Sequence, residues 1–203
     1  MKILLIGATG MVGTRLLTEA RSRGHDVEAA ARNVAALPGG LALDASDAAA
    51  VTAAAQGVEV IISAVSPRST PDAMSEAREV AAAEIAAAKA TGARLVVVGG
   101  AGTSLFPDGS PVIDKIDPIY KTEASALKAV RDDLAASGVD WTFVTPPFVI
   151  APGVRTGAYR TGGQTVVMAA DGQSHISAED FAVALLDFVE QGTYRGQLIS
   201  VGT

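Results

Sequence analysis

The chain opens with Met1-Lys2-Ile3-Leu4-Leu5-Ile6-Gly7-Ala8-Thr9-Gly10-Met11-Val12-Gly13, and this stretch decides the fold. Met1–Ile6 is an apolar run that predicts a buried strand, and a helical pattern begins at Thr14. The three glycines between them have the spacing G-x-x-G-x-x-G. A strand, a glycine-rich turn and a helix in this order are typical of a dinucleotide-binding turn. A turn that serves packing alone is the other interpretation, and the order of the elements disfavours it.

Each glycine has its own predicted role in this turn. Gly7 permits the tight turn, Gly10 lets the backbone approach a pyrophosphate, and Gly13 lets the helix lie close to the strand. The first turn of the helix offers unpaired N–H groups and a partial positive charge to the phosphates. The predicted phosphate-binding residues are Gly7, Thr9, Gly10, Met11, Val12 and Gly13.

Composition limits the classes of protein to which the chain can belong. With 203 residues it is long enough for one domain with a substantial core, and 49% of its residues are hydrophobic. The net charge of −6 argues against a nucleic-acid partner, which would need a basic face. The chain has no cysteine and two histidines, so thiol chemistry is excluded and we expect no metal site. No apolar run is long enough to span a membrane, and we expect a cytoplasmic protein without a signal peptide.

Strand-like and helix-like segments alternate along the whole chain. This alternation predicts an α/β fold of the Rossmann type, with a doubly wound, mostly parallel sheet and helices on both faces. The predicted strands are Lys2–Ile6, Asp26–Ala31, Leu41–Leu43, Glu59–Val65, Arg94–Val98, Asp140–Val144 and Leu198–Val201. The predicted helices are Gly10–Arg23, Ala48–Ala55, Pro71–Thr91, Ile119–Ser137 and Ala178–Glu190.

Two segments interrupt the alternation. Thr103–Pro118 reads as a long loop, and Ala151–Gly172 is rich in glycine and proline with short β-like pieces at Ala158–Arg160 and Thr165–Met168. We expect both segments at the edge of the sheet where strands end, because ligands of open parallel sheets bind there. We therefore expect one domain over residues 1–203, with 151–172 as a small insertion on the substrate side.

The end of the second strand indicates which dinucleotide is bound. In NAD-binding versions of the motif an acidic residue about 20 positions after the third glycine binds the ribose 2′-hydroxyl, but here Arg32 stands at this place. An arginine can pair with a 2′-phosphate, and Arg15 could assist, so we expect NADP(H) in preference to NAD(H). An Arg32 that is merely exposed is the alternative. Asp44 is the candidate acceptor for the adenine amino group, and Ser63-Ala64-Val65 is expected along the ribose and nicotinamide.

Longer strings of residues carry a resemblance to a known family. They are Gly7–Gly13, Ala31-Arg32-Asn33, Val98-Gly99-Gly100-Ala101-Gly102, Asp140-Trp141-Thr142-Phe143-Val144-Thr145-Pro146-Pro147 and Ile176-Ser177-Ala178-Glu179-Asp180-Phe181-Ala182. Over nearly its whole length the chain resembles the atypical short-chain dehydrogenase/reductase group. It is most similar to the NAD(P)H-binding branch of NADH-flavin reductases, near the biliverdin-IXβ reductases. The resemblance implies a Rossmann fold, a bound nicotinamide dinucleotide and hydride transfer.

The resemblance also implies further residues at the cofactor. Gly99 and Gly100 belong to one of its shared strings. The segment after the sixth strand packs beside the nicotinamide in this family. The cofactor-binding residues so implied are Gly99, Gly100, Thr145, Pro146, Pro147 and Phe148.

The acid/base motif of short-chain dehydrogenases is broken in this chain. The usual motif is Tyr-x-x-x-Lys, in which the lysine lies one helical turn from the tyrosine and lowers its pKa. Here Tyr120 is followed four residues later by Ala124 instead of lysine. Tyr120 and Ser104 remain the candidate catalytic hydroxyls. Because alcohol oxidation needs a positioned base, the change disfavours an alcohol dehydrogenase.

These observations favour an NADPH-dependent reductase of a flavin or a similar flat, electron-poor acceptor. Proximity and stacking would supply most of the catalysis in such an enzyme. The alternatives are a non-catalytic NADP(H) sensor of the same fold and, less favoured, a sugar epimerase or dehydratase. We expect a small-molecule acceptor and no membrane partner, and the sequence leaves open whether the chain is a monomer or a dimer.

Overall fold

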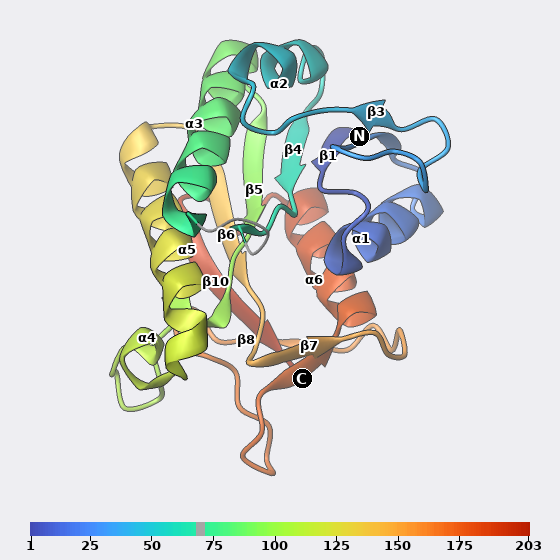
Figure 1. Cartoon of the computed structure of the whole chain (residues 1–203). Coiled ribbons are helices and arrows are strands. Elements are labelled where there is room, and N and C mark those ends of the chain that lie inside the picture. Colours follow the sequence, from blue (N-terminus) through green and yellow to red (C-terminus); the bar gives the residue numbers. More distant parts are fainter. Residues whose placement is uncertain (68–71) are drawn as a thin grey trace.

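The fold is built on a mostly parallel sheet in a computed structural model that describes residues 1–67 and 72–203. In this part of the chain the strand order is β3-β2-β1-β4-β5-β6-β10-β8 (Figure 1). All neighbouring strands are parallel except β10 and β8. The strands are β1 (Lys2–Ile6), β2 (Asp26–Ala31), β3 (Leu41–Ala42), β4 (Val60–Ser63), β5 (Arg94–Val98), β6 (Trp141–Thr145), β8 (Arg160–Thr161) and β10 (Gln197–Gly202). The predicted Rossmann-type fold is confirmed.

Helices cover both faces of this sheet and divide the core into two layers (Figure 1). Successive side chains of a strand point to opposite faces, so Ile3 and Leu5 pack in one layer and Leu4 and Ile6 in the other. The first layer includes residues of α1 (Met11–Ser22) and α6 (Ala178–Gln191), and the second includes residues of α2 (Ala48–Ala54), α3 (Ala73–Thr91) and α5 (Pro118–Ser137). Burial of both faces explains why the strands read as continuous apolar runs.

The first helix approaches the first strand more closely than a side chain would allow. A Cβ atom on Gly13 would lie 2.0 Å from the backbone oxygen of Gly7, and one on Gly7 would lie 2.6 Å from the backbone oxygen of Ala64. Gly7 also has a φ of +85°, in the region that favours glycine. Strand, turn and helix therefore fit together only because these two positions lack side chains.

The predicted elements are present, with small differences at their ends. The largest difference is at β4, which ends at Ser63 although the prediction continued to Val65. The reason is that Ala64 leaves the strand to pack its carbonyl against Gly7. Pro71, the predicted start of the third helix, lies outside the described residues, and α3 begins at Ala73 after an Asp72 cap.

The segment expected as one long loop contains regular structure. A 3₁₀ turn at Ala101–Thr103 precedes the expected loop, and the short helix α4 (Val112–Lys115) lies inside it. Pro118 is already the first residue of α5, where its missing N–H costs nothing and Asp117 caps the helix by accepting from the Ile119 N–H at 3.0 Å.

The 151–172 insertion differs from its predicted β-like pieces. Thr165–Met168 forms no strand, because Thr165 makes only an isolated bridge to Leu105. The expected piece at Ala158–Arg160 is displaced to Arg160–Thr161, where two residues pair with β10. A two-stranded parallel sheet of β7 (Val149–Ala151) and β9 (His175–Ser177), which the sequence did not predict, flanks the insertion.

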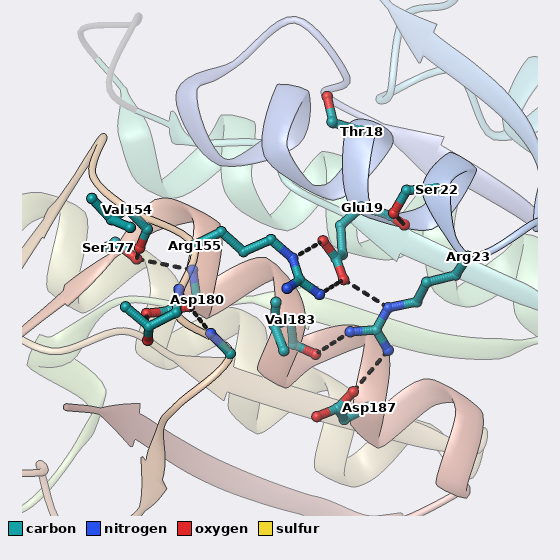
Figure 2. Close-up of polar contacts among 12 residues, drawn as sticks. Thr18, Glu19, Ser22, Arg23, Val154, Arg155, Ser177, Asp180, Val183 and Asp187 are labelled. Atoms are coloured by element: carbon teal, nitrogen blue, oxygen red, sulfur yellow. Dashed lines mark hydrogen bonds and ion pairs between the residues drawn. The ribbon is translucent and has the colours of Figure 1, made fainter.

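Charged groups on α1 and α6 bind residues near the start of the insertion, around Arg155 (Figure 2). The Arg155 guanidinium donates to both carboxylate oxygens of Glu19 at 2.7 Å, and Arg23 Nε donates to the same carboxylate at 2.9 Å. The hydrogen bond from Arg155 and the second cation lower the pKa of the Glu19 carboxyl to about 2. Because Arg23 also binds Asp187 on α6 at 2.7 Å, this network joins three elements.

A second carboxylate of α6 holds the backbone of the same segment. Asp180 is buried, and it accepts hydrogen bonds from the backbone N–H groups of Thr156 at 2.8 Å and Gly157 at 2.7 Å. The Thr156 hydroxyl donates to its other oxygen at 2.7 Å. The backbone donors of this turn are therefore satisfied by one side chain, which fixes the path of the chain beside α6.

The contact between α1 and β1 gives a test of the fold. Gly13→Ala forces a Cβ against the backbone of Gly7, which can move away only at a high cost in free energy. We therefore expect a loss of about 3 kcal/mol in the free energy of unfolding. Gly10→Ala is the matched control, because its Cβ would lie 3.4 Å from the nearest atom. Denaturant unfolding of the two variants measures the difference, and equal stabilities would show that the close approach is not required.

Candidate functional site

The candidate site lies at the edge of the sheet where the parallel strands end. From β1 the chain first extends the sheet to one side through β2 and β3, and it then extends the sheet to the other side from β4 onward. Ligands of open α/β sheets bind outside the carboxyl ends of the strands at such a switch point, which here lies between β1 and β4. The turn that follows β1 and the segment that follows β4 meet there, since the Ala64 N–H donates to the Ile6 carbonyl at 2.8 Å. The glycine-rich turn is therefore at the place that the topology favours for a ligand.

Backbone hydrogen bonds fix the shape of the glycine turn. The N–H groups of Gly7 and Ala8 both donate to the Ala30 carbonyl, at 2.9 and 3.1 Å, and the Gly10 N–H donates to the Gly7 carbonyl at 3.0 Å. The turn is thus tied to the end of β2 as well as to β1. Gly10 itself has an extended backbone that other residues can adopt, with φ −73° and ψ 168°. Its lack of a side chain is not needed for this conformation.

The first turn of α1 presents its positive end without a competing acidic group. Gly10 is the N-cap, no described side chain caps the helix, and the first turn contains no acidic residue. The first N–H groups of a helix have no partner within it, so those of Met11, Val12 and Gly13 are suited to bind an anion. Thr9 and Gly10 are exposed beside them. These residues fit a dinucleotide pyrophosphate.

Arg32 and Asp44 lie beyond β2 and β3, where the adenosine half of a dinucleotide is expected. Arg32 has a side chain 63% exposed, and its Nη1 lies 3.6 Å from Glu76 Oε1 on α3. Asp44 accepts hydrogen bonds from the Ser46 N–H at 3.0 Å and the Ser46 hydroxyl at 2.8 Å, and these bonds hold its pKa below the usual range. An exposed cation and an ionised carboxylate are therefore available for a phosphate and an amino group.

Arg15 does not join Arg32, although the sequence suggested that it could. Its Nε binds Glu179 of α6 at 3.0 Å, and its Nη1 donates to the Met11 carbonyl and the Thr14 hydroxyl. Arg15 points to α6 because α6 packs against α1 and offers a carboxylate on that side of the helix, and its assistance to Arg32 stays a prediction. Arg32, in contrast, lies beside Glu76 of α3.

The residues after β6 are mostly buried, with one exposed ring. Thr145, Pro146 and Pro147 are buried, whereas Phe148 is 42% exposed. The Phe148 ring lies 5.9 Å from the Phe106 ring at an angle of 48°. The residues from 103 to 118 and the segment after β6 thus meet in an aromatic pair at the surface, which is suited to contact a flat apolar molecule.

The hydroxyl groups near β5 and β6 bind one another in the interior. Ser104 Oγ lies 3.1 Å from Thr145 Oγ1 and 3.0 Å from Ser200 Oγ, and the latter two are 2.9 Å apart. All three residues are nearly inaccessible. The hydroxyl of Ser104 is therefore used to join the 103–118 segment to β6 and β10, and in this conformation it does not face solvent.

Packing accounts for the glycines of the Val98–Gly102 string. A Cβ on Gly99 would lie 2.1 Å from the Phe143 ring, and one on Gly100 would lie 2.8 Å from a methyl group of Leu127. A Cβ on Gly102 would lie 2.5 Å from the Ala124 Cβ. Gly99 and Gly100 are thus explained by close packing alone, and their place at the cofactor stays a prediction.

The position at which short-chain dehydrogenases usually have the catalytic lysine is occupied here by the buried Ala124. Ala124 is 6% exposed and faces Gly102, so a lysine at this position could not reach the edge of the sheet without displacing the 3₁₀ turn. Tyr120 is 56% exposed on the first turn of α5, and the adjacent Lys121 is also exposed. The tyrosine therefore has no cation fixed one helical turn away.

Exposed apolar side chains gather on the carboxyl side of the sheet. Of the eight large apolar side chains that the described residues expose, seven belong to segments that follow strand ends or to the first turns of helices. These seven are Met11, Met74, Ile119, Tyr120, Phe148, Val149 and Val154. The edge thus combines an uncapped helix N-terminus with exposed apolar side chains, a combination suited to a dinucleotide and a ring-shaped acceptor.

Sequence reasoning missed one unusual group beside this edge. Glu84, in the middle of α3, is 1% exposed in a layer of alanine and valine side chains. Burial raises the pKa of its carboxyl to about 7, against a smaller lowering by a hydrogen bond from the Ser63 side chain. A signal was present, because Glu84 is the one acid in the stretch from Val80 to Ala88 that is otherwise apolar.

Comparison with known proteins agrees with this geometry. A family described as NAD(P)H-binding matches residues 7–191. The uncharacterized protein YwnB of Bacillus subtilis (strain 168) is 32% identical over 99% of this chain and 98% of its own length.

Two solved structures are similar over the full chain. A “putative exported protein” of Burkholderia pseudomallei is 39% identical, with a TM-score of 0.90 and all of both chains covered. A “putative NADH-flavin reductase” of Streptococcus pneumoniae TIGR4 is 28% identical, with a TM-score of 0.90, covering 100% of this chain and 99% of the other.

The glycine turn gives a direct test of the phosphate site. A valine at Gly10 fits the backbone conformation and meets no atom of the chain closer than 3.4 Å at its Cβ, so we expect the domain to stay folded. The side chain would occupy the space that a pyrophosphate needs above the first turn of α1. Calorimetric titration of Gly10→Val with NADPH and NADH should show at least about a hundredfold weaker binding. Unchanged affinity in the folded variant would place the phosphates elsewhere.

Proposed function

The chain belongs to the NAD(P)H-binding family, and we propose that it is an NADPH-dependent reductase that acts on a flavin or a similar flat, electron-poor acceptor. Family membership supports an oxidoreductase that binds a nicotinamide cofactor. Three features at the same edge together carry the finer proposal: the α1 terminus is uncapped, the exposed Phe148 ring pairs with the half-buried Phe106, and alanine stands at position 124 in place of lysine.

The described residues would divide the binding of the two molecules. The N–H groups of Met11–Gly13 would hold the pyrophosphate, and Arg32 would hold the 2′-phosphate that distinguishes NADPH from NADH. Asp44 would accept from the adenine amino group. Ser63, Ala64 and Val65 would line the ribose and nicotinamide.

The acceptor would lie over the nicotinamide, against Phe148 and Phe106. Bound NADPH would supply a hydride, so that the acceptor gains two electrons and the cofactor leaves as NADP⁺. The second hydrogen of the reduced acceptor would come as a proton from solvent, because the edge is open at Tyr120 and Phe148. The chain would contribute proximity and an apolar stacking surface, which are sufficient for transfer between two rings.

A sensor that binds NADP(H) without turnover is the second candidate. The exposed Tyr120 without a lysine partner and the buried Ser104 favour it, since neither hydroxyl is arranged as an acid/base group. Turnover with an added acceptor separates the two candidates.

Among the described residues, no helix is both long and apolar enough to cross a membrane. Location in the cytoplasm stays a prediction.

The acceptor surface is tested by steady-state oxidation of NADPH with added FMN. Phe148→Asp places a charge on the stacking surface, and we expect about a tenfold loss of kcat/KM with an unchanged Kd for NADPH. Phe148→Leu is the control, because it keeps an apolar side chain. Tyr120→Phe should stay within about twofold of wild type, whereas loss of a general acid would cost about a hundredfold or more. Absence of turnover with any flavin or quinone would favour the sensor.

The preference for NADPH is tested at Arg32. Arg32→Ala removes the cation that would face the 2′-phosphate, and loss of a charge-assisted hydrogen bond of about 1.5–3 kcal/mol should weaken NADPH binding more than tenfold. NADH has no 2′-phosphate, so its affinity should not change. Arg131→Ala on α5 is the control, since this arginine pairs with the neighbouring Asp132. Wild-type protein that binds NADPH and NADH equally would overturn the preference.

A further inference from the structure

A buried acid on α3 lines a cavity beside the end of β4 and is not used by the proposed reaction. Glu84 Oε1 is buried without a hydrogen-bond partner among the described residues. A buried carboxyl group that lacks a cation is costly to ionise, and most such groups are found neutral or at functional sites. The position of Glu84 therefore needs an explanation beyond the packing of α3.

The surroundings of Glu84 connect it to the edge of the sheet. A narrow cavity of about 20 Å³ lies between the sheet, α3 and α5, and Glu84 and Ser63 both line it. Val65, Pro67 and Glu76 also line this cavity, and they lie next to the edge where β4 ends. The carboxyl-bearing residue Glu84 and the segment that follows β4 therefore border the same small cavity.

Ser63 links this carboxyl to the glycine turn. Ser63 lines the same cavity as Glu84, and its hydrogen bonding to the Glu84 carboxyl opposes the rise in pKa that burial causes. Ser63 is the last residue of β4 and pairs with Ile6, the residue that precedes Gly7. The carbonyl of the next residue, Ala64, packs against Gly7. The hydrogen-bond partner of Glu84 therefore stands one residue from the turn that would hold the pyrophosphate.

Among the described residues, no cationic side chain lines the cavity beside Glu84. Of the residues that the structure describes, Glu76 is the one other titratable residue that lines the cavity, and it is itself acidic and paired with Arg32. From α5 the cavity receives Leu127 and Val130, and from β5 it receives Val97. The α2 helix contains no ionisable side chain, and Arg94 lies at the opposite end of β5, where it binds the Phe188 carbonyl and Thr142. The described lining of the cavity therefore offers no cation to a negative charge on Glu84.

We propose that Glu84 and Ser63 form a proton-linked pair, in which binding of the dinucleotide at the glycine turn is coupled to uptake of a proton by Glu84. The pyrophosphate brings negative charge to the edge above Ser63, and repulsion through the protein interior opposes an ionised Glu84. Neutral Glu84 also donates to the Ser63 oxygen, which leaves the Ser63 hydrogen free to point toward the edge. Glu84 is a positioning residue in this scheme, and it does not touch the reacting atoms.

The sign of the pH effect follows from the direction of the pKa shift. Burial raises the pKa of Glu84 to about 7 in the free protein, so the neutral form dominates below this pH. A ligand that favours the neutral form binds best at low pH, and its affinity falls as the pH rises through about 7. By the same linkage, the bound ligand raises the pKa of Glu84 further.

The proposal rests on the proposed cofactor site, and it is tested by the binding of NADH to the full chain. NADH is the probe because it lacks the 2′-phosphate, which would titrate in the same range. We expect the Kd of wild-type protein to rise about tenfold between pH 6 and pH 8.5. Glu84→Gln should keep the low-pH affinity over the whole range, because glutamine matches the neutral acid in shape and donor capacity. Titration calorimetry near pH 7.5 in buffers of different ionisation enthalpy should show proton uptake by wild type alone.

A second variant tests the link through the serine. Ser63→Ala removes the hydrogen bond that lowers the pKa of Glu84, so the midpoint of the affinity change should move to higher pH. Both variants keep the two histidines of the chain, His25, which binds Glu190, and His175. A pH dependence of the affinity that came from a histidine would therefore persist in both variants.

The outcomes separate the two proposals. A pH-independent Kd in wild type, or a pH dependence that persists in Glu84→Gln, would overturn the proton-linked pair while leaving the cofactor site in place. Failure of wild type to bind any nicotinamide dinucleotide between pH 6 and pH 8.5 would overturn the proposed function and the pair together.

Discussion

The structure depends on the close approach of α1 to the end of β1. Gly13 lies against the Gly7 carbonyl, and Gly7 lies against the Ala64 carbonyl, at separations that exclude a Cβ on either residue. This packing brings the first turn of α1 to the edge between β1 and β4, where no side chain of the described residues caps its N–H groups. The same contact ends β4 at Ser63, because Ala64 must turn toward Gly7. The position of the proposed anion site is thus a consequence of backbone packing.

The two faces of the sheet support this edge in different ways. On one face, α1 and α6 are joined by ion pairs among Glu19, Arg23 and Asp187, and Arg155 ties the insertion to them (Figure 2). On the other face, α3 packs through alanine and valine, with Glu84 as its buried acid. A charge network that is satisfied holds a segment in place, whereas an isolated buried carboxyl responds to charge nearby. The first face is therefore suited to rigidity and the second to coupling with a bound ligand.

The sequence predicted the parts of the fold that local chemistry determines. The apolar strands, the glycine turn and the glycines that end helices, such as Gly92 and Gly138, all carry signals within a few residues. The insertion after β6 was not predicted in detail, because its path depends on Asp180 and Glu19, which are distant in sequence. Glycines of the Val98–Gly102 string suggested a cofactor contact, but their neighbours Phe143 and Leu127 become visible only in the folded chain. Likewise, the reason for Ala124 lies in Gly102, which packs against it.

A crystal structure of the protein with NADP⁺ tests the central claim most directly. The account predicts pyrophosphate oxygens within hydrogen-bonding distance of the backbone N–H groups of Met11–Gly13, the 2′-phosphate beside Arg32, and the nicotinamide between the segment after β4 and Phe148. It would be contradicted by a dinucleotide bound away from the first turn of α1, or by crystals in which saturating NADP⁺ leaves that turn unchanged and without a ligand.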